Sequence, residues 1–165
     1  MTPRVEFVAA SPRWRAALPA RSLARETIAV AARESGVALA PGAELCIHLA
    51  DDEHVRALNA RWRGLDKPTN VLSFPAVAAS EIAKARLIGD VVLAFETVAR
   101  EAADEAKPLA DHYHHLVAHG FLHLIGFDHE NEAEAERMEA METRILAQLG
   151  VADPYRADEA ADARL

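Results

Sequence analysis

The sequence lacks a second cysteine and any long run of apolar residues. Among its 165 residues only Cys46 carries a thiol, so an internal disulfide is excluded and a reducing compartment is expected. No apolar stretch approaches the roughly 20 residues that cross a bilayer. The N-terminal segment carries charged residues such as Arg4 and Glu6 instead of a signal-peptide core. We therefore expect a soluble, cytoplasmic protein with no membrane partner.

The sequence also lacks a positive net charge. The formal net charge is −8, which argues against a nucleic-acid partner because phosphate binding normally needs a basic surface. The charge is unevenly distributed, however. Residues 54–70 hold four basic side chains against one acid, whereas residues 130–165 hold ten acids against four arginines. A local basic surface therefore keeps a nucleic-acid partner possible.

The length suits one compact domain with a single core. Alternating or continuous apolar patterns predict strands at 5–8, 44–49, 71–74 and 88–95. Helical periodicity and capping residues predict helices at 21–35, from 51–53 onward, and at 96–106, 108–125 and 132–148, with a loop or short helix at 76–87. The prediction is an α+β fold with about four strands in a mixed sheet and packed helices. Residues 1–150 would form a single metallohydrolase-like domain and residues 151–165 a C-terminal tail.

Three histidines have the spacing of a metal site. His119 and His123 lie four residues apart in a predicted helix, so both imidazoles are on one face of it. Gly126 can end the helix in a left-handed turn, which allows His129 to return to the same ion. Three neutral ligands leave a fourth position for water, whose pKa a zinc ion lowers to about 7. Zinc is the expected ion, with nickel, copper and iron as alternatives.

The pattern H-x-x-x-H-x-x-G-x-x-H is also the ligand skeleton of the metzincin proteases. Those enzymes carry a glutamate, their general base, directly after the first histidine, and this chain has Gly120 there. The pattern therefore predicts a metal site without the peptide-cleaving base. A small metallohydrolase acting on peptides or esters is kept as an alternative function.

Two neighbours of the histidines are further candidates. His115 lies one turn before His119 on the same side of the helix, so it competes for a ligand role, but we interpret it as a residue that supports a ligand or is purely structural. Asp128 precedes His129 and has two open interpretations. It could orient an imidazole or accept a proton from water in a catalytic role, or it could simply build the turn.

Residues 119–129, HGFLHLIGFDH, resemble a signature of the YbeY family of bacterial rRNA maturation endoribonucleases. Residues 58–63 with 66–75, and residues 88–90, resemble two further signatures, so the resemblance runs from about residue 45 to 129. It implies a zinc-dependent, single-strand-specific endoribonuclease of 16S rRNA maturation and ribosome quality control. It also implies one zinc ion per chain on His119, His123 and His129. RNA, as a single-stranded 16S rRNA precursor, and the ribosome or ribosomal proteins would be its partners.

The resemblance also places Arg63 on an arginine of the family's active-site cleft. A guanidinium group can bind a phosphate with two hydrogen bonds and stabilise the charge that develops during cleavage. Arg61 and Lys67 supply a basic context and are candidate substrate-binding residues. The negative net charge suits a third alternative, a metal-containing ribosome-assembly factor with a mainly binding role.

Overall fold

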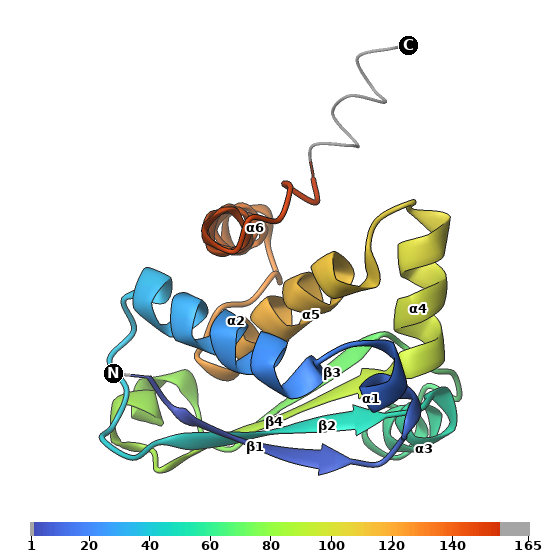
Figure 1. Cartoon of the computed structure of the whole chain (residues 1–165). Helices are drawn as coiled ribbons and strands as arrows, with labels where there is room; N and C mark the ends of the chain where they lie inside the picture. Colours follow the sequence, from blue (N-terminus) through green and yellow to red (C-terminus); the bar gives the residue numbers. More distant parts are fainter. Residues whose placement is uncertain (1, 156–165) are drawn as a thin grey trace.

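Four strands form a mixed sheet at the base of the molecule (Figure 1). The structure, a computed structural model, describes residues 2–155. The order across the sheet is β1-β2-β4-β3, in which β1, β2 and β4 run parallel and β3 runs antiparallel to β4. The predicted α+β fold with a four-stranded mixed sheet is therefore confirmed. The strands are β1 (Arg4–Ala9), β2 (Glu44–Ala50), β3 (Val71–Pro75) and β4 (Leu87–Ala94).

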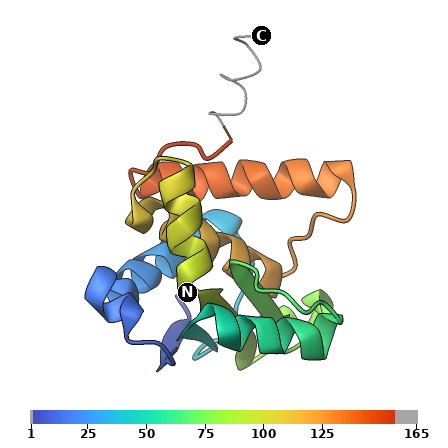
Figure 2. The same cartoon turned by 90° about the vertical axis from the view of Figure 1, so that its right-hand side faces the viewer.

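Helices cover the two faces of the sheet unequally. Two long helices, α2 and α5, lie across one face, α6 lies above them, and α3 packs on the opposite face beside β4 (Figures 1 and 2). The short helix α1 was not predicted, because Pro12 and Pro19 closely bracket it. The elements are α1 (Arg13–Ala17), α2 (Ala20–Ser35), α3 (Asp52–Arg63), η1 (Ala79–Lys84), α4 (Phe95–Asp104), α5 (Leu109–Leu124) and α6 (Glu132–Gln148).

Side chains along β2 point alternately to the two faces of the sheet, and the two faces differ in burial. Leu45, Ile47 and Leu49 are buried in the main core beneath α2 and α5. The residues between them, Cys46 and His48, are half-buried on the other side. Only part of that second side is covered, by the small cluster in which α3 meets the sheet. The main core therefore lies between the sheet and the helix that carries the histidines.

The buried surface of helix α5 includes polar side chains as well as apolar ones. On a helical wheel His114 falls outside both the apolar side of α5 and the side that carries His115, His119 and His123, yet it is buried because α2 packs on it. Its Nδ1 lies 2.6 Å from Thr27 Oγ1, and that hydroxyl donates to the Leu23 carbonyl at 2.8 Å. Since the hydroxyl has only one proton, His114 Nδ1–H must donate to Thr27.

The buried His114 should make stability depend on pH. Burial lowers the pKa of His114, so below about pH 6.5 the unfolded chain takes up a proton that the folded chain resists. The free energy of unfolding therefore falls as the pH drops below that value. For each pH unit over which His114 is protonated only in the unfolded chain, the free energy of unfolding falls by about 1.4 kcal/mol.

His114→Asn should flatten this dependence, since its amide can still donate to Thr27 but does not titrate. Urea unfolding with a chelator present, at about pH 7.5 and about pH 5.5, measures the loss of stability in wild type and variant. Equal losses in the two proteins would show that His114 does not contribute.

Candidate metal centre

Helix α5 and the loop after it bring three imidazoles together. His119 and His123 lie one turn apart on α5, and His129 follows in the loop toward α6. One ring nitrogen from each lies within 4.8 Å of the others, a separation from which all three can hold one metal ion. Gly126, with φ of 110°, adopts a left-handed conformation where the chain turns back after the helix. The three ring centroids are 4.7, 5.0 and 6.0 Å apart.

A buried carboxylate from α6 holds the first of these imidazoles. Glu142 is fully buried, and its Oε1 lies 2.5 Å from Nδ1 of His119. Its Oε2 lies 3.1 Å from Nε2 of His115 and also accepts a hydrogen bond from the Tyr155 hydroxyl. A carboxylate can only accept, so His119 donates from Nδ1 and keeps Nε2 available for a metal.

Electrostatics favour the metal-binding forms of these groups. Burial raises the pKa of Glu142, but the hydrogen bonds from His115 and His119 outweigh it and hold that pKa at about 2. Glu142 is therefore an anion, and an anion behind a ligating imidazole makes that imidazole a stronger ligand. Burial, together with the neighbouring His119 and His129, lowers the pKa of His123 and keeps it neutral, as metal binding requires.

Glu142 and Tyr155 were missed by the sequence analysis. Glu142 lies four residues after Met138 and three before Ile145, on the side of α6 that is buried. The sequence signal that could have identified Glu142 is an acidic residue among the apolar residues of one helix face. Tyr155 falls in the predicted tail, where residues 151–155 lie close to α6 and residues 156–165 are outside the described part of the chain.

At Gly120 the backbone of α5 packs closely against strands β3 and β4 of the sheet. A Cβ atom at this position would come within 2.7 Å of Val91 Cγ1 and 3.3 Å of Ser73 Oγ. The Ser73 hydroxyl donates to the Gly120 carbonyl at 3.1 Å. A glutamate side chain at position 120 would therefore collide with Val91 on β4 and Ser73 on β3. This geometry gives a structural reason why the peptidase base is absent.

Gly120→Ala should destabilise the protein despite the better helix propensity of alanine. Propensity favours alanine by about 1 kcal/mol, whereas overpacking a tight core costs about 1 to 3 kcal/mol. We expect a net loss of about 1 kcal/mol in the free energy of unfolding, measured in urea. The control is Gly120→Ala combined with Val91→Ala, which removes the clashing methyl groups. The double variant should lose less than the sum of the single variants, and simple additivity would contradict the contact.

His115 and Asp128 occupy different positions relative to the cluster. His115 contacts Glu142, the carboxylate that also holds His119, and its role in supporting a ligand stays a prediction. Asp128 Oδ1 accepts the backbone N–H of His129 at 2.8 Å. That bond is typical of a turn residue, which was one of the two interpretations left open.

The basic candidates lie in the last turn of α3 and in the loop that leads to β3. Arg63 is the last residue of α3 and is exposed, and the Arg61 guanidinium lies 5.2 Å from the centre of the Trp62 ring. The buried Asn59 fixes the following loop by donating to the Lys67 carbonyl at 2.9 Å. Within residues 2–155, no hydrogen bond or ion pair joins this segment to the three histidines. The segment leads into β3, on which Ser73 contacts α5.

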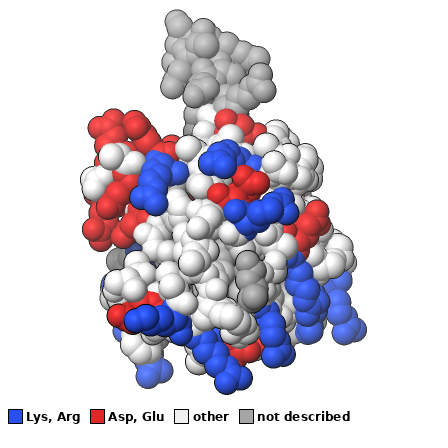
Figure 3. All heavy atoms as spheres, turned by 90° about the vertical axis from the view of Figure 1, so that its left-hand side faces the viewer, with Lys and Arg blue, Asp and Glu red and all other residues white. Residues whose placement is uncertain are grey.

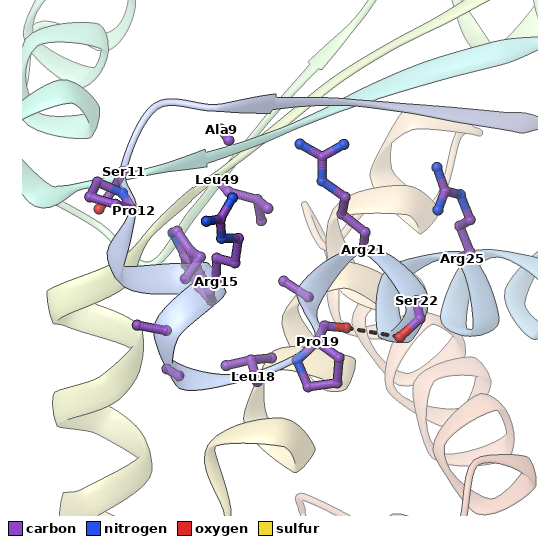
Figure 4. Close-up of a pocket in the computed structure, with 14 residues that line it drawn as sticks. Ala9, Ser11, Pro12, Arg15, Leu18, Pro19, Arg21, Ser22, Arg25 and Leu49 are labelled. Atoms are coloured by element: carbon purple, nitrogen blue, oxygen red, sulfur yellow. Dashed lines mark hydrogen bonds between the residues drawn. The ribbon is translucent and has the colours of Figure 1, made fainter.

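A large cavity lies apart from the histidines, among α1, the start of α2 and the ends of β1 and β2. Its volume is about 1070 Å³, and Arg15, Arg21 and Arg25 line it (Figure 4). None of these arginines forms an ion pair with a carboxylate within residues 2–155, and the cavity has no acidic lining residue.

On the face shown in Figure 3, acidic side chains gather at the upper left and basic ones over the lower part. On this face, acidic and basic side chains are therefore separated in space.

The fold and the site define a class: a small α+β protein with three imidazoles able to hold one metal ion. The family model described as "Endoribonuclease YbeY" matches residues 14–150, and the chain belongs to this family. Similar proteins called endoribonuclease YbeY occur in Rhodopseudomonas palustris strain BisA53, with 50% identity over 97% of this chain and 94% of that protein. Another, from Nitrobacter winogradskyi, has 48% identity over 96% and 85%.

A solved structure also shares the fold. It is the solution structure of TM1509 from Thermotoga maritima, with a TM-score of 0.56 and 20% identity, covering 91% of this chain and 97% of that one. At this level of identity the likeness concerns the fold alone. Among residues 2–155, no helix combines the length and the apolar character of a membrane span.

Proposed function

We propose that this chain is a zinc-dependent endoribonuclease that hydrolyses phosphodiester bonds of single-stranded RNA in 16S rRNA maturation and ribosome quality control. The observation that carries the proposal is the cluster of His119, His123 and His129 in a member of an endoribonuclease family. The donor set fits zinc, which binds neutral imidazoles in a tetrahedral arrangement with one open position. Such an ion, when bound, supplies Lewis acidity and a water nucleophile near neutral pH.

The protein's own residues would position the ion and the substrate. Glu142 fixes the ring of His119 so that its free nitrogen stays directed for binding. We assign Arg63 to the scissile phosphate, where a guanidinium can stabilise the added negative charge, and Arg61 and Lys67 to neighbouring phosphates. Asp128 is the remaining candidate for proton transfer beside the cluster. The arginines of the large cavity add a second basic surface on a chain whose net charge is −8.

The setting would be the cytoplasm, with the ribosome or ribosomal proteins as partners. The peptide or ester hydrolase is the weaker alternative, because position 120 faces the sheet and leaves no place for the protease glutamate. A direct test incubates the purified protein with single-stranded and duplex RNA of the same sequence, with and without a chelator. Cleavage of the single strand alone, lost with the chelator and restored by zinc, supports the proposal. Cleavage that persists without metal contradicts it.

Arg63→Ala should lower cleavage without removing the metal. Loss of a group that stabilises transition-state charge typically costs about 100-fold or more in rate. The measurements are the rate of RNA cleavage at saturating zinc and the metal content of the same preparation. Arg33→Ala, an exposed arginine on α2 whose neighbour is Glu34, is the matched control and should cleave at the wild-type rate.

Arg63→Ala also separates the enzyme from a ribosome-assembly factor. A binding factor with a structural metal would lose ribosome association in this variant and would unfold when its metal is removed. Wild-type cleavage by Arg63→Ala would show that Arg63 does not act in the reaction.

A further inference from the structure

Three potential metal ligands lie on the sheet face opposite α5. Cys46 and His48 are two residues apart on β2, so their side chains share one face of the strand. Asp90 on β4 is in register with Cys46 on the adjacent strand. The thiol sulfur, one imidazole nitrogen and one carboxylate oxygen all lie within 4.8 Å of one another.

We propose that Cys46, His48 and Asp90 form a second metal site, which takes a divalent transition metal such as zinc. Zinc bonds of about 2.0 to 2.3 Å place tetrahedral ligand atoms about 3.3 to 3.8 Å apart, so small side-chain rotations close the site. His48 Nε2 and Asp90 Oδ1 are 2.9 Å apart in a hydrogen bond, which the ion would replace once the His48 proton is held on Nδ1. The two parallel strands that carry these residues are hydrogen-bonded neighbours and form a rigid base.

The charge around the thiol favours a cation. Asp90 is the nearest carboxylate to the thiol, while Glu6 is paired with Arg4 at 3.2 Å. Burial raises the pKa of Cys46, and the negative charges of Asp90 and Glu6 raise it further. Glu6 on β1 is in register with Cys46 from the other side. Within the described chain, no lysine or arginine forms an ion pair with Asp90. A divalent ion would displace the thiol proton and be neutralised by one thiolate and one carboxylate.

The ion can reach this position from solvent. The side chains of His48 and Asp90 are 25% and 49% exposed, and both border a groove of about 410 Å³ that also contains Trp62 and Phe74. A water molecule can complete the coordination, because three protein ligands leave the fourth position open. An ion here would cross-link β2 to β4 and would stabilise the sheet independently of the histidine cluster.

Cobalt(II) substitution distinguishes the two sites because the chain has a single cysteine. A thiolate bound to cobalt gives a near-ultraviolet charge-transfer absorption, and the three-histidine cluster has no thiolate. We expect wild type to bind two cobalt ions per chain and to show this absorption. His119→Ala should keep the absorption, whereas Cys46→Ser should lose it together with one ion per chain.

His48→Ala tests the geometry of the site and should also abolish the absorption. Zinc should slow alkylation of Cys46 in wild type but not in His48→Ala, a measurement that does not depend on the folding of Cys46→Ser. Circular dichroism of each metal-free variant checks that it is folded. The proposal is overturned if folded wild type gives no thiolate absorption, or if the absorption survives in His48→Ala. It is also overturned if zinc leaves the alkylation rate of the wild type unchanged.

Discussion

Replacing His119 with alanine should reduce RNA cleavage by more than about 100-fold, since loss of a group that merely supports a metal ligand already costs about 10- to 100-fold. His119 is the imidazole that α5 presents and Glu142 fixes, so its loss leaves two ligands and an unpaired buried carboxylate oxygen. Cleavage of a labelled single-stranded RNA, together with the zinc content after dialysis, measures the effect. Added zinc should not restore the rate.

The control for this prediction is His54→Ala. His54 is an exposed histidine near the start of α3, so its replacement removes an imidazole of the same chemistry from the surface. It should leave cleavage at the wild-type rate. If His119→Ala cleaved RNA at a rate near that of His54→Ala, the three-histidine cluster would not be the catalytic site.

The second large effect is expected at Glu142. Glu142→Ala removes the acceptor for His115, His119 and Tyr155 at once and leaves three half-buried donors without this partner. We expect the zinc affinity to fall by about 10- to 100-fold. The free energy of unfolding should fall by about 3 kcal/mol, because a buried network loses its only anion. Chelator competition measures the first quantity and urea unfolding of the metal-free protein measures the second.

Glu139→Ala is the matched control, since it removes an exposed acid from the same helix. Its zinc affinity and stability should stay close to those of the wild type. Glu142→Gln should have intermediate zinc affinity and stability. Its amide keeps one acceptor oxygen, but its NH2 group faces a histidine N–H that is also a donor. A Glu142→Ala protein that bound zinc as tightly as wild type would show that the carboxylate does not orient His119.

Local patterns were enough to predict most of the fold. The alternation in residues 44–49 and the apolar run in residues 88–95 identified the two central strands, β2 and β4, because burial imposes a period on the sequence. The spacing of His119, His123 and His129 could be read in the same way, since helix geometry and one glycine determine how they meet. These features depend only on residues close together in the chain.

The contacts between distant segments could not be predicted. Glu142 lies 23 residues from His119, and only the packing of α6 against α5 brings them together. The burial of His114 could not be predicted either, because a helical wheel does not reveal that α2 covers that side of α5. The position of Gly120 against Val91 also needed the structure, since the sequence shows a missing glutamate but not what occupies its direction.

The close approach at Gly120 bears on how this family relates to proteases with the same histidine spacing. A single codon change could introduce the protease glutamate, but its side chain would start in the space that Val91 and Ser73 occupy. Conversion between the two chemistries would first require α5 to move away from the sheet or to rotate about its axis. The shared histidine pattern therefore does not make this nuclease one substitution away from a peptidase.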